Sequence, residues 1–321
     1  MDAIGGSLSF TQDVLTRYGM TTYFAFGNIG LFFNLNIFSR SIHRRNPGSL
    51  YILSMTICNF FCLNFGIIPF IYALNHPDPV TTSLIMCKLQ FYLRHTPYQM
   101  MRSFMILSCF NRYISSHVQH RFQNFNQYQI TIRCIIIVII FWLLVCIFIP
   151  ILLSIEANTC GMFIDSYALL YSIYILIFAG ILPPLVMIIC SFLIIKNLKK
   201  IRSRVQPLAV TSKMNLIRKR DRDYIRMLLV EIMVYVLLTF PYTLSVFYTT
   251  VDQLGSSEYE YEQWEIFLIY FTRSFLLYLN SSLSFWIYII MSKSFRNEFH
   301  DLLLKWYLIL KKFKDKLVNF V

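Results

Sequence analysis

The chain alternates long apolar stretches with shorter polar segments, and seven of the stretches are long enough to be membrane-spanning helices. A helix needs roughly 20 apolar residues to cross the hydrocarbon core of a bilayer. The seven stretches lie near residues 21–38, 50–74, 84–114, 132–153, 167–195, 225–248 and 266–291, and each is bounded by charge, Pro, Gly or Asn. The pattern predicts an all-α membrane protein, folded as a seven-transmembrane helix bundle.

Composition agrees with this prediction. Hydrophobic residues make up 57% of the chain and charged residues 14%, whereas soluble domains carry about 25% charged residues. The third and seventh stretches nevertheless contain ionisable side chains, among them Arg94, Arg102 and Arg273. Because an ion in the hydrocarbon core is costly, we expect these side chains to face the bundle interior or its water-filled mouth.

The distribution of charge predicts the orientation in the membrane. The net charge is +13, and most of the 29 Lys and Arg residues lie after the first, third and fifth stretches and in the C-terminal tail. The positive-inside rule puts these segments in the cytoplasm and the N-terminus outside the cell, at the plasma membrane. The positive charge is therefore a signal of topology, and we expect no nucleic-acid partner.

The predicted domain organisation has three parts. Residues 1–19 form an extracellular tail, residues 20–292 the seven-helix domain, and residues 293–321 a cytoplasmic amphipathic helix and tail. In the last part, large apolar residues recur at steps of three and four: Phe295, Phe299, Leu302, Trp306, Leu310 and Phe313. This spacing indicates a helix lying on the inner leaflet of the bilayer. The alternative is a soluble helix packed on the protein.

Several short motifs occur together along the chain at defined spacings. Cys87 opens the third stretch and Asn111-Arg112-Tyr113 ends it, so about 37 Å of helix separates Cys87 from Arg112. The other motifs are Trp142 with Pro150, Phe240-Pro241-Tyr242, and Tyr288 followed by Phe295-Arg296. With this set the chain resembles the rhodopsin-like (class A) G-protein-coupled receptors, and its overall pattern is similar to invertebrate orphan and neuropeptide-type receptors.

The resemblance implies a signalling mechanism and a set of site residues. A ligand from outside shifts the bundle toward a state in which helix six swings outward and a heterotrimeric G protein binds. It also implies a disulfide between Cys87 and Cys160. The implied coupling and switch residues are Asn111, Arg112, Tyr113, Asp221, Pro241 and Tyr288. We expect Arg112 and Asp221 to pair in the inactive state, the alternative being that Asp221 is solvated among the neighbouring cations.

Other positions depart from the family pattern. Asn111 replaces the acid that usually precedes the arginine, and Asn59 replaces the aspartate of helix two. Ser284-Phe285 stands where the family has Asn-Pro. Without an anionic oxygen ligand we expect no sodium site, and more generally no metal and no cofactor. A receptor of this fold that no longer couples to G proteins is the corresponding alternative.

The ligand class is narrowed by exclusion. Arg94 occupies the position of the aspartate of amine receptors, and Tyr278 that of the lysine that binds retinal. The candidate ligand-binding residues are Arg94, His95, Tyr98, Gln99, Arg102, Tyr242, Glu265, Tyr270, Arg273 and Tyr278. Guanidinium groups favour an anionic or carbonyl-rich ligand group, and the acidic outer rim favours basic groups. A peptide satisfies both. The alternative is that Arg94 and Arg102 pair internally, with Glu265 or with carbonyls.

Three other classes of membrane protein fit less well. An intramembrane enzyme needs convergent polar groups, but Glu231 is a lone acid and His95 has no evident partner, so we expect no enzymatic activity. Transporters and channels more often show internal repeats or interrupted helices. A seven-helix olfactory channel subunit has the opposite orientation. A receptor for a non-peptide or chemosensory ligand remains the alternative within the family.

Overall fold

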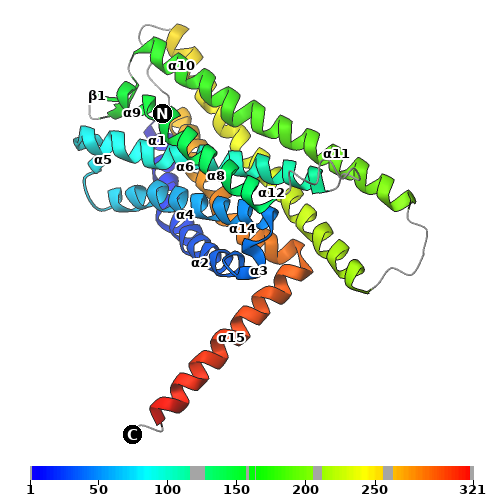
Figure 1. The fold of residues 1–321 in the computed structure, drawn as a ribbon. Helices are drawn as coiled ribbons and strands as arrows, with labels where there is room; N and C mark the ends of the chain where they lie inside the picture. Colours follow the sequence, from blue (N-terminus) through cyan, green and yellow to red (C-terminus); the bar gives the residue numbers. More distant parts are fainter. Residues whose placement is uncertain are drawn as a thin grey trace.

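The computed structural model of the protein is almost entirely helical and describes residues 2–115, 127–156, 159–162, 164–204, 212–255 and 263–318. The helices pack side by side in a bundle from which the last helix projects (Figure 1). Within the described residues the bundle has seven helical segments: α2 (Thr21–Phe38), α4 (Pro47–Ala73), α6 (Leu84–Ser115), α8 (Tyr128–Val145) with α9 (Phe148–Leu152), α10 (Asp165–Ile175) with α11 (Leu182–Arg204), α12 (Ser212–Gly255), and α13 (Gln263–Tyr270) with α14 (Leu277–Met291).

The seven apolar stretches of the sequence all fall in these segments, and the first coincides with α2. Length and composition qualify five helical segments of the described chain as membrane-crossing: Pro47–Ala73, Tyr128–Leu152, Ser166–Asn197, Ile225–Asp252 and Gln263–Met291. The other two are more polar, because α2 carries three asparagines and α6 carries several ionisable residues. The structure therefore confirms the all-α membrane fold.

In the described part of the chain, three π-helical turns lie within longer helices. They are η1 (Leu15–Met20), η2 (Leu176–Ile181) and η3 (Phe271–Leu276). The turn η1 joins α1 (Asp2–Val14) to α2, so the N-terminal segment that we expected as a tail is helical. It packs beside α13, where Thr16 Oγ1 and the Tyr270 hydroxyl are 2.6 Å apart.

Local sequence signals set the starts of the helices that follow short connections. Asn46 caps α4, its Oδ1 accepting a hydrogen bond of 3.1 Å from the Gly48 N–H, and Pro47 occupies the first turn. Asp78 caps the short α5 (Pro79–Thr82) in the same way. These Asn-Pro and Asp-Pro pairs satisfy N–H groups that a helix start leaves open. A single turn, α3 (Ser41–Arg44), connects α2 to α4.

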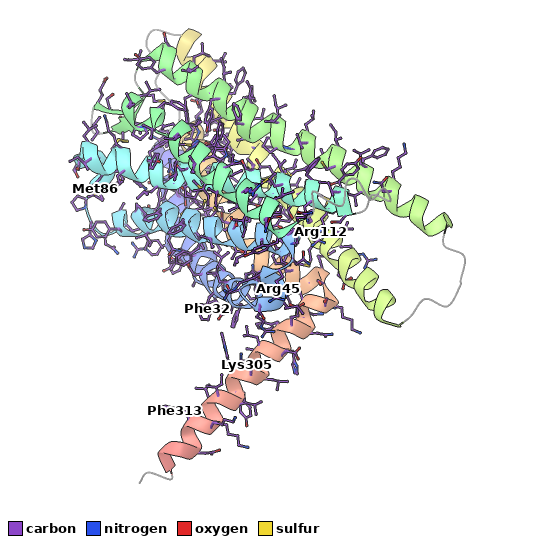
Figure 2. The ribbon with its side chains drawn as sticks, viewed as in Figure 1. Phe32, Arg45, Met86, Arg112, Lys305 and Phe313 are labelled. Carbon is purple, nitrogen blue, oxygen red and sulfur yellow. A yellow bond between two sulfur atoms is a disulfide. The ribbon has the colours of Figure 1, made fainter. Side chains whose placement is uncertain are left out.

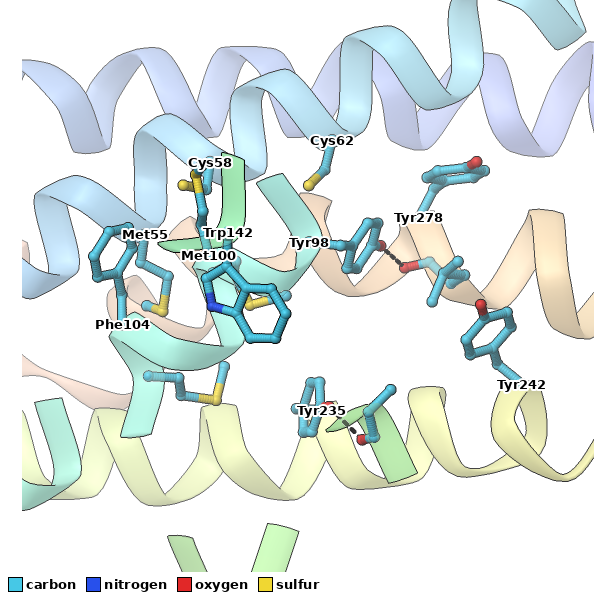
Figure 3. Close-up of a cluster of buried hydrophobic side chains, with 14 of the residues drawn as sticks. Met55, Cys58, Cys62, Tyr98, Met100, Phe104, Trp142, Tyr235, Tyr242 and Tyr278 are labelled. Atoms are coloured by element: carbon cyan, nitrogen blue, oxygen red, sulfur yellow. Dashed lines mark hydrogen bonds between the residues drawn. The ribbon is translucent and has the colours of Figure 1, made fainter. Parts of the chain in front are cut away.

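Helix α6 occupies the middle of the bundle and contacts α4, α8, α9 and α11. Its inner surface is rich in sulfur and aromatic side chains. Figure 3 shows Met100 and Phe104 of α6 with Cys58 and Cys62 of α4 and Trp142 of α8. These residues are buried, as are the free cysteines Cys109, Cys146 and Cys190, whereas Cys134 is half-buried. Small sulfur side chains fill the gaps between larger apolar groups.

Helices α4 and α14 approach closely at Gly66. A Cβ atom added to Gly66 would overlap the ring of Tyr278, whose side chain is fully buried. We expect Gly66→Ala to destabilise the receptor by about 1–3 kcal/mol, because overpacking outweighs the gain in helix propensity. Thermal unfolding of the purified receptor measures the effect. The double variant Gly66→Ala/Tyr278→Leu should recover part of the loss, and an unchanged unfolding temperature for Gly66→Ala would contradict the close contact.

The last helix, α15 (Lys293–Val318), begins against the bundle and then leaves it (Figures 1 and 2). In its first half Phe295 and Leu302 are buried, and Trp306 lies against Phe33 of α2 with ring centroids 5.8 Å apart. From residue 303 onward the described large apolar residues other than Trp306 are exposed: Leu303, Leu304, Tyr307, Leu308, Ile309, Leu310 and Phe313. The apolar surface of α15 thus contacts protein near its start and has no protein cover toward its end.

Candidate functional site

At one end of the bundle a disulfide attaches a hairpin to α6. Strands β1 (Ser154–Glu156) and β2 (Thr159–Gly161) pair antiparallel, with Ile155 opposite Cys160. Cys160 is bonded to Cys87 in the first turn of α6, and their Cα atoms are 5.9 Å apart. The predicted disulfide is therefore confirmed. We refer to this end of the molecule as the disulfide end.

Two turns below the disulfide, Arg94 points at aromatic residues of other helices. Its Nη1 donates a hydrogen bond of 3.1 Å to the Tyr278 hydroxyl on α14. Its guanidinium also lies 4.7 Å from the centre of the Phe91 ring. Tyr171 on α10 and Tyr242 on α12 are close neighbours. Among the described residues Arg94 has no carboxylate partner, so the expected alternative of a pair with Glu265 is not what the structure contains.

Next to Arg94 and one turn deeper, His95 and Gln99 form a polar network with Tyr174 of α10. The Gln99 amide donates to the Tyr174 hydroxyl at 2.7 Å, and His95 Nε2 lies 3.1 Å from the same hydroxyl. Gln99 Oε1 accepts a hydrogen bond of 3.0 Å from Nη1 of Arg102. Sequence reasoning missed Tyr174. The available signal was the spacing of Tyr167, Tyr171 and Tyr174 at three and four residues on α10, which puts them on one helix face.

Arg102 is the deepest ionisable residue of this group. Its side chain is 3% exposed and lies over the Tyr98 ring, 5.3 Å from the ring centre. Tyr98 itself donates its hydroxyl proton to the Leu277 carbonyl. In Figure 3, Tyr98, Tyr278 and Tyr242 approach from three helices, α6, α14 and α12. The structure thus brings together seven of the predicted ligand residues: Arg94, His95, Tyr98, Gln99, Arg102, Tyr242 and Tyr278. We call them the arginine–tyrosine cluster.

The other three predicted ligand residues have different neighbours. Tyr270 contacts the N-terminal helix through Thr16. Arg273 donates through Nη2 to the Ser245 carbonyl at 2.8 Å, which links η3 to α12. Glu265 is buried near the disulfide end and accepts a hydrogen bond of 3.5 Å from Tyr248. The hydrogen bonds of Tyr270 and Arg273 join helices to each other.

At the opposite end of the bundle, Asn111 and Arg112 are both buried at the end of α6, and Tyr113 is half-buried. The Arg112 guanidinium lies directly over Gly48 at the start of α4. The approach is so close that a Cβ atom at Gly48 would come within 2.7 Å of Nη2. Figure 2 shows Arg112 and Arg45 together at this end, far from Met86. The side chain of Asp221 lies outside the described residues, so the Arg112–Asp221 pair stays a prediction.

Two acids of α12 that sequence reasoning did not assign to the switch have described partners. Glu231 is 4% exposed and its Oε2 accepts a hydrogen bond of 2.8 Å from the Tyr288 hydroxyl on α14. Asp223 is buried and accepts from the Ser294 N–H at 3.4 Å, in the first turn of α15. A carboxylate at a helix N-terminus is favoured by the helix dipole. Helix α12 therefore contacts α14 through the carboxyl group of Glu231 and α15 through that of Asp223.

Pro241 lies inside α12, between the two ends of the molecule. Proline has no N–H, so the carbonyl one turn before it, that of Leu237, lacks its usual intrahelical donor. The helix is weakest at this point. A hinge there would separate the segment that carries Glu231 from the segment that carries Tyr242.

Comparison with known proteins gives a family. Residues 33–288 match the family model of the rhodopsin-family 7-transmembrane receptors. A search of curated proteins finds no matching relative. The matched range extends from within α2 to Tyr288 in α14 and includes the disulfide, the arginine–tyrosine cluster and Arg112. The chain is thus a multi-pass membrane protein of a signal-transducing class, and it belongs to the rhodopsin family of seven-transmembrane receptors.

Proposed function

We propose that this receptor couples binding of an extracellular peptide to activation of a heterotrimeric G protein at the plasma membrane. The observation that carries the proposal is the distribution of charge along α6. Arg94 lies against aromatic side chains toward the disulfide end, and Arg112 is buried at the other end. Their sequence separation of 18 corresponds to about 27 Å of helix. Ligand recognition and G-protein coupling are thereby assigned to opposite ends of one helix.

The orientation is part of the proposal. Disulfides persist in oxidising compartments, which favours an extracellular disulfide end. The N-terminal helix α1 lies at that same end (Figure 1). Arg45 and Arg112 lie at the other end (Figure 2), which agrees with a cytoplasmic face. Helix α15 then starts at the cytoplasmic side, where its uncovered apolar residues have the inner leaflet as a partner.

A peptide is the ligand class that Arg94 and the acidic residues near the disulfide end together favour. Arg94 has neutral partners among the described residues, so it offers a bidentate donor to a carboxylate or carbonyl group. Nearer the rim, Asp13 on α1 and Glu156 on β1 are exposed acids. They favour a ligand that also carries basic groups. A peptide combines these groups in one molecule.

The test is G-protein dissociation in cells challenged with pools of amidated basic peptides and of acidic peptides. An epitope tag at the N-terminus, stained on intact cells, verifies both surface expression and orientation. We expect a response in the wild type that Arg112→Ala abolishes, because the buried guanidinium is lost. Arg133→Ala is the matched control: Arg133 is an exposed arginine of α8, and this variant should respond like the wild type.

A receptor that no longer couples is the second candidate, and one observation favours it. Asn111 occupies the position of the family's acid beside Arg112 and is buried with it. Silence of the wild type toward every peptide pool, with verified surface staining, would shift weight to this candidate or to a non-peptide or chemosensory ligand. A tag reachable only after permeabilisation would contradict the orientation.

A further inference from the structure

Arg102 is a permanent cation near the middle of α6, at the level of the membrane interior. The helix runs from Leu84 to Ser115, so Arg102 is far from both ends. Guanidinium groups stay charged in proteins, and an isolated buried charge is strongly unfavourable. Intramembrane cations therefore pair with an anion or with strongly polar groups. The question is what neutralises Arg102.

Among the described residues, the partners of Arg102 are all neutral. Nη1 of Arg102 donates to Gln99 Oε1 at 3.0 Å, and the guanidinium lies over the Tyr98 ring. Nε is buried and has no acceptor within hydrogen-bonding distance among the described residues. The buried acids of the described bundle have donors elsewhere: Glu231 and Glu265 accept hydrogen bonds from tyrosines, and Asp223 accepts one from the Ser294 N–H. The unit positive charge of Arg102 is left without a described counter-charge.

The tyrosines around Arg102 do not replace a counter-charge. Tyr98, Tyr174, Tyr235 and Tyr242 interact electrostatically with Arg102. Tyr235 donates its hydroxyl proton to the Ala179 carbonyl at 2.7 Å, and Tyr98 donates to the Leu277 carbonyl. Their oxygens can accept from a guanidinium, but neutral hydroxyls carry no net charge. An anion beside Nε would satisfy both the open donor and the charge balance.

We propose that the receptor binds a small monovalent anion at Arg102, with Nε of Arg102 as its main donor. The chemistry fits chloride from solution or the carboxylate of an extracellular ligand that reaches this depth. The site belongs to the deepest part of the arginine–tyrosine cluster. The proposed anion site is independent of the proposed function, because neither a peptide nor a G protein is needed to detect anion binding.

The experiment is thermal unfolding of the purified full-length receptor, without ligand, in nanodiscs. Sodium chloride is compared with sodium gluconate at equal ionic strength, and a third series uses sodium acetate. Chloride at tenfold its dissociation constant should raise the unfolding temperature by about 2 °C, with saturation. Arg102→Met should remove the chloride dependence. Arg133→Met, which changes an exposed arginine of α8, should retain it.

A second variant keeps the test valid if Arg102→Met does not fold. Gln99→Glu converts the partner of Nη1 into an internal counter-ion of nearly the same shape. We expect this variant to unfold in gluconate at the temperature of wild type in chloride, and to lose its chloride dependence. Stabilisation of the wild type by acetate alone would support the site and assign it to a ligand carboxylate. Equal unfolding of the wild type in all three salts, or an equal chloride effect in Arg102→Met, would overturn the proposal.

Discussion

Replacement of Cys160 by serine is expected to destabilise the receptor by about 2–4 kcal/mol and to reduce the amount at the cell surface. The bond from Cys87 to Cys160 closes a loop with a sequence separation of 73, which includes α6 and α8. Reduction releases the β1–β2 hairpin from the first turn of α6. The hairpin then keeps its contacts with α5 and α6 and the packing of Ile155 against the core, but it is a two-stranded sheet and such a sheet is marginal alone.

The disulfide prediction is checked by thermal unfolding of Cys87→Ser, Cys160→Ser and the double variant. Either single variant should cost about as much as the double variant, since each already breaks the bond and the effects of residues in one interaction do not add. Cys134→Ser is the control, because Cys134 is a free, half-buried cysteine of α8. Additive losses from the two single variants would show that the sulfurs act separately.

Replacement of Tyr288 by phenylalanine is the second large effect that we expect, here on basal signalling. The Tyr288 hydroxyl donates to the carboxyl group of Glu231, and both side chains are almost fully buried. The bond joins α12 to α14. If activation moves helix six outward, as in the family, the bond is lost in the open state, and its removal favours that state. A buried hydrogen bond contributes about 0.5–1.5 kcal/mol net, which corresponds to about a 2- to 13-fold shift between closed and open states.

Basal G-protein dissociation at matched surface expression measures this shift. Glu231→Leu should raise basal signalling as Tyr288→Phe does, and the double variant should equal either one. Tyr307→Phe is the control, because Tyr307 is an exposed tyrosine of α15. If Tyr288→Phe and the wild type signal equally without ligand, while the ligand response is retained, the bond does not hold the inactive state.

The prediction of the fold from sequence succeeded where the signal is local. The apolar stretch at residues 21–38 is helix α2, and Asn46-Pro47 marks the start of α4. Membrane helices are set by apolar length and by terminal residues, and both can be read along the chain. The N-terminal helix α1 could not be read in this way. It carries Gly5 and Gly6, which favour a flexible segment, and it packs against α13, far away in sequence.

Seven of the ten candidate ligand residues lie together in the structure, but the partners of the buried polar residues could not be predicted from the sequence. Glu231 was recognisable as a lone acid in an apolar helix. Its partner Tyr288 is 57 residues away, and the pairing depends on how α12 and α14 rotate against each other. Tyr174 was missed for the same reason, since helix five meets His95 and Gln99 through the tertiary fold. The cap of α15 by Asp223 also depends on such a contact.

The π-helical turns have a consequence for transferring ligand positions between receptors by counting residues. A π-turn holds one more residue than an α-turn. The side-chain directions before the turn are therefore rotated about the helix axis by roughly 100° relative to those in an uninterrupted α-helix. Helix seven contains such a turn at Phe271–Leu276, between Tyr270 and Tyr278. Counting back from Tyr288, residues as far as Tyr278 therefore point in the directions expected for an α-helix. Residues before the turn at Phe271–Leu276 do not. A homologue without this turn would point a different residue at its ligand in the outer part of the helix.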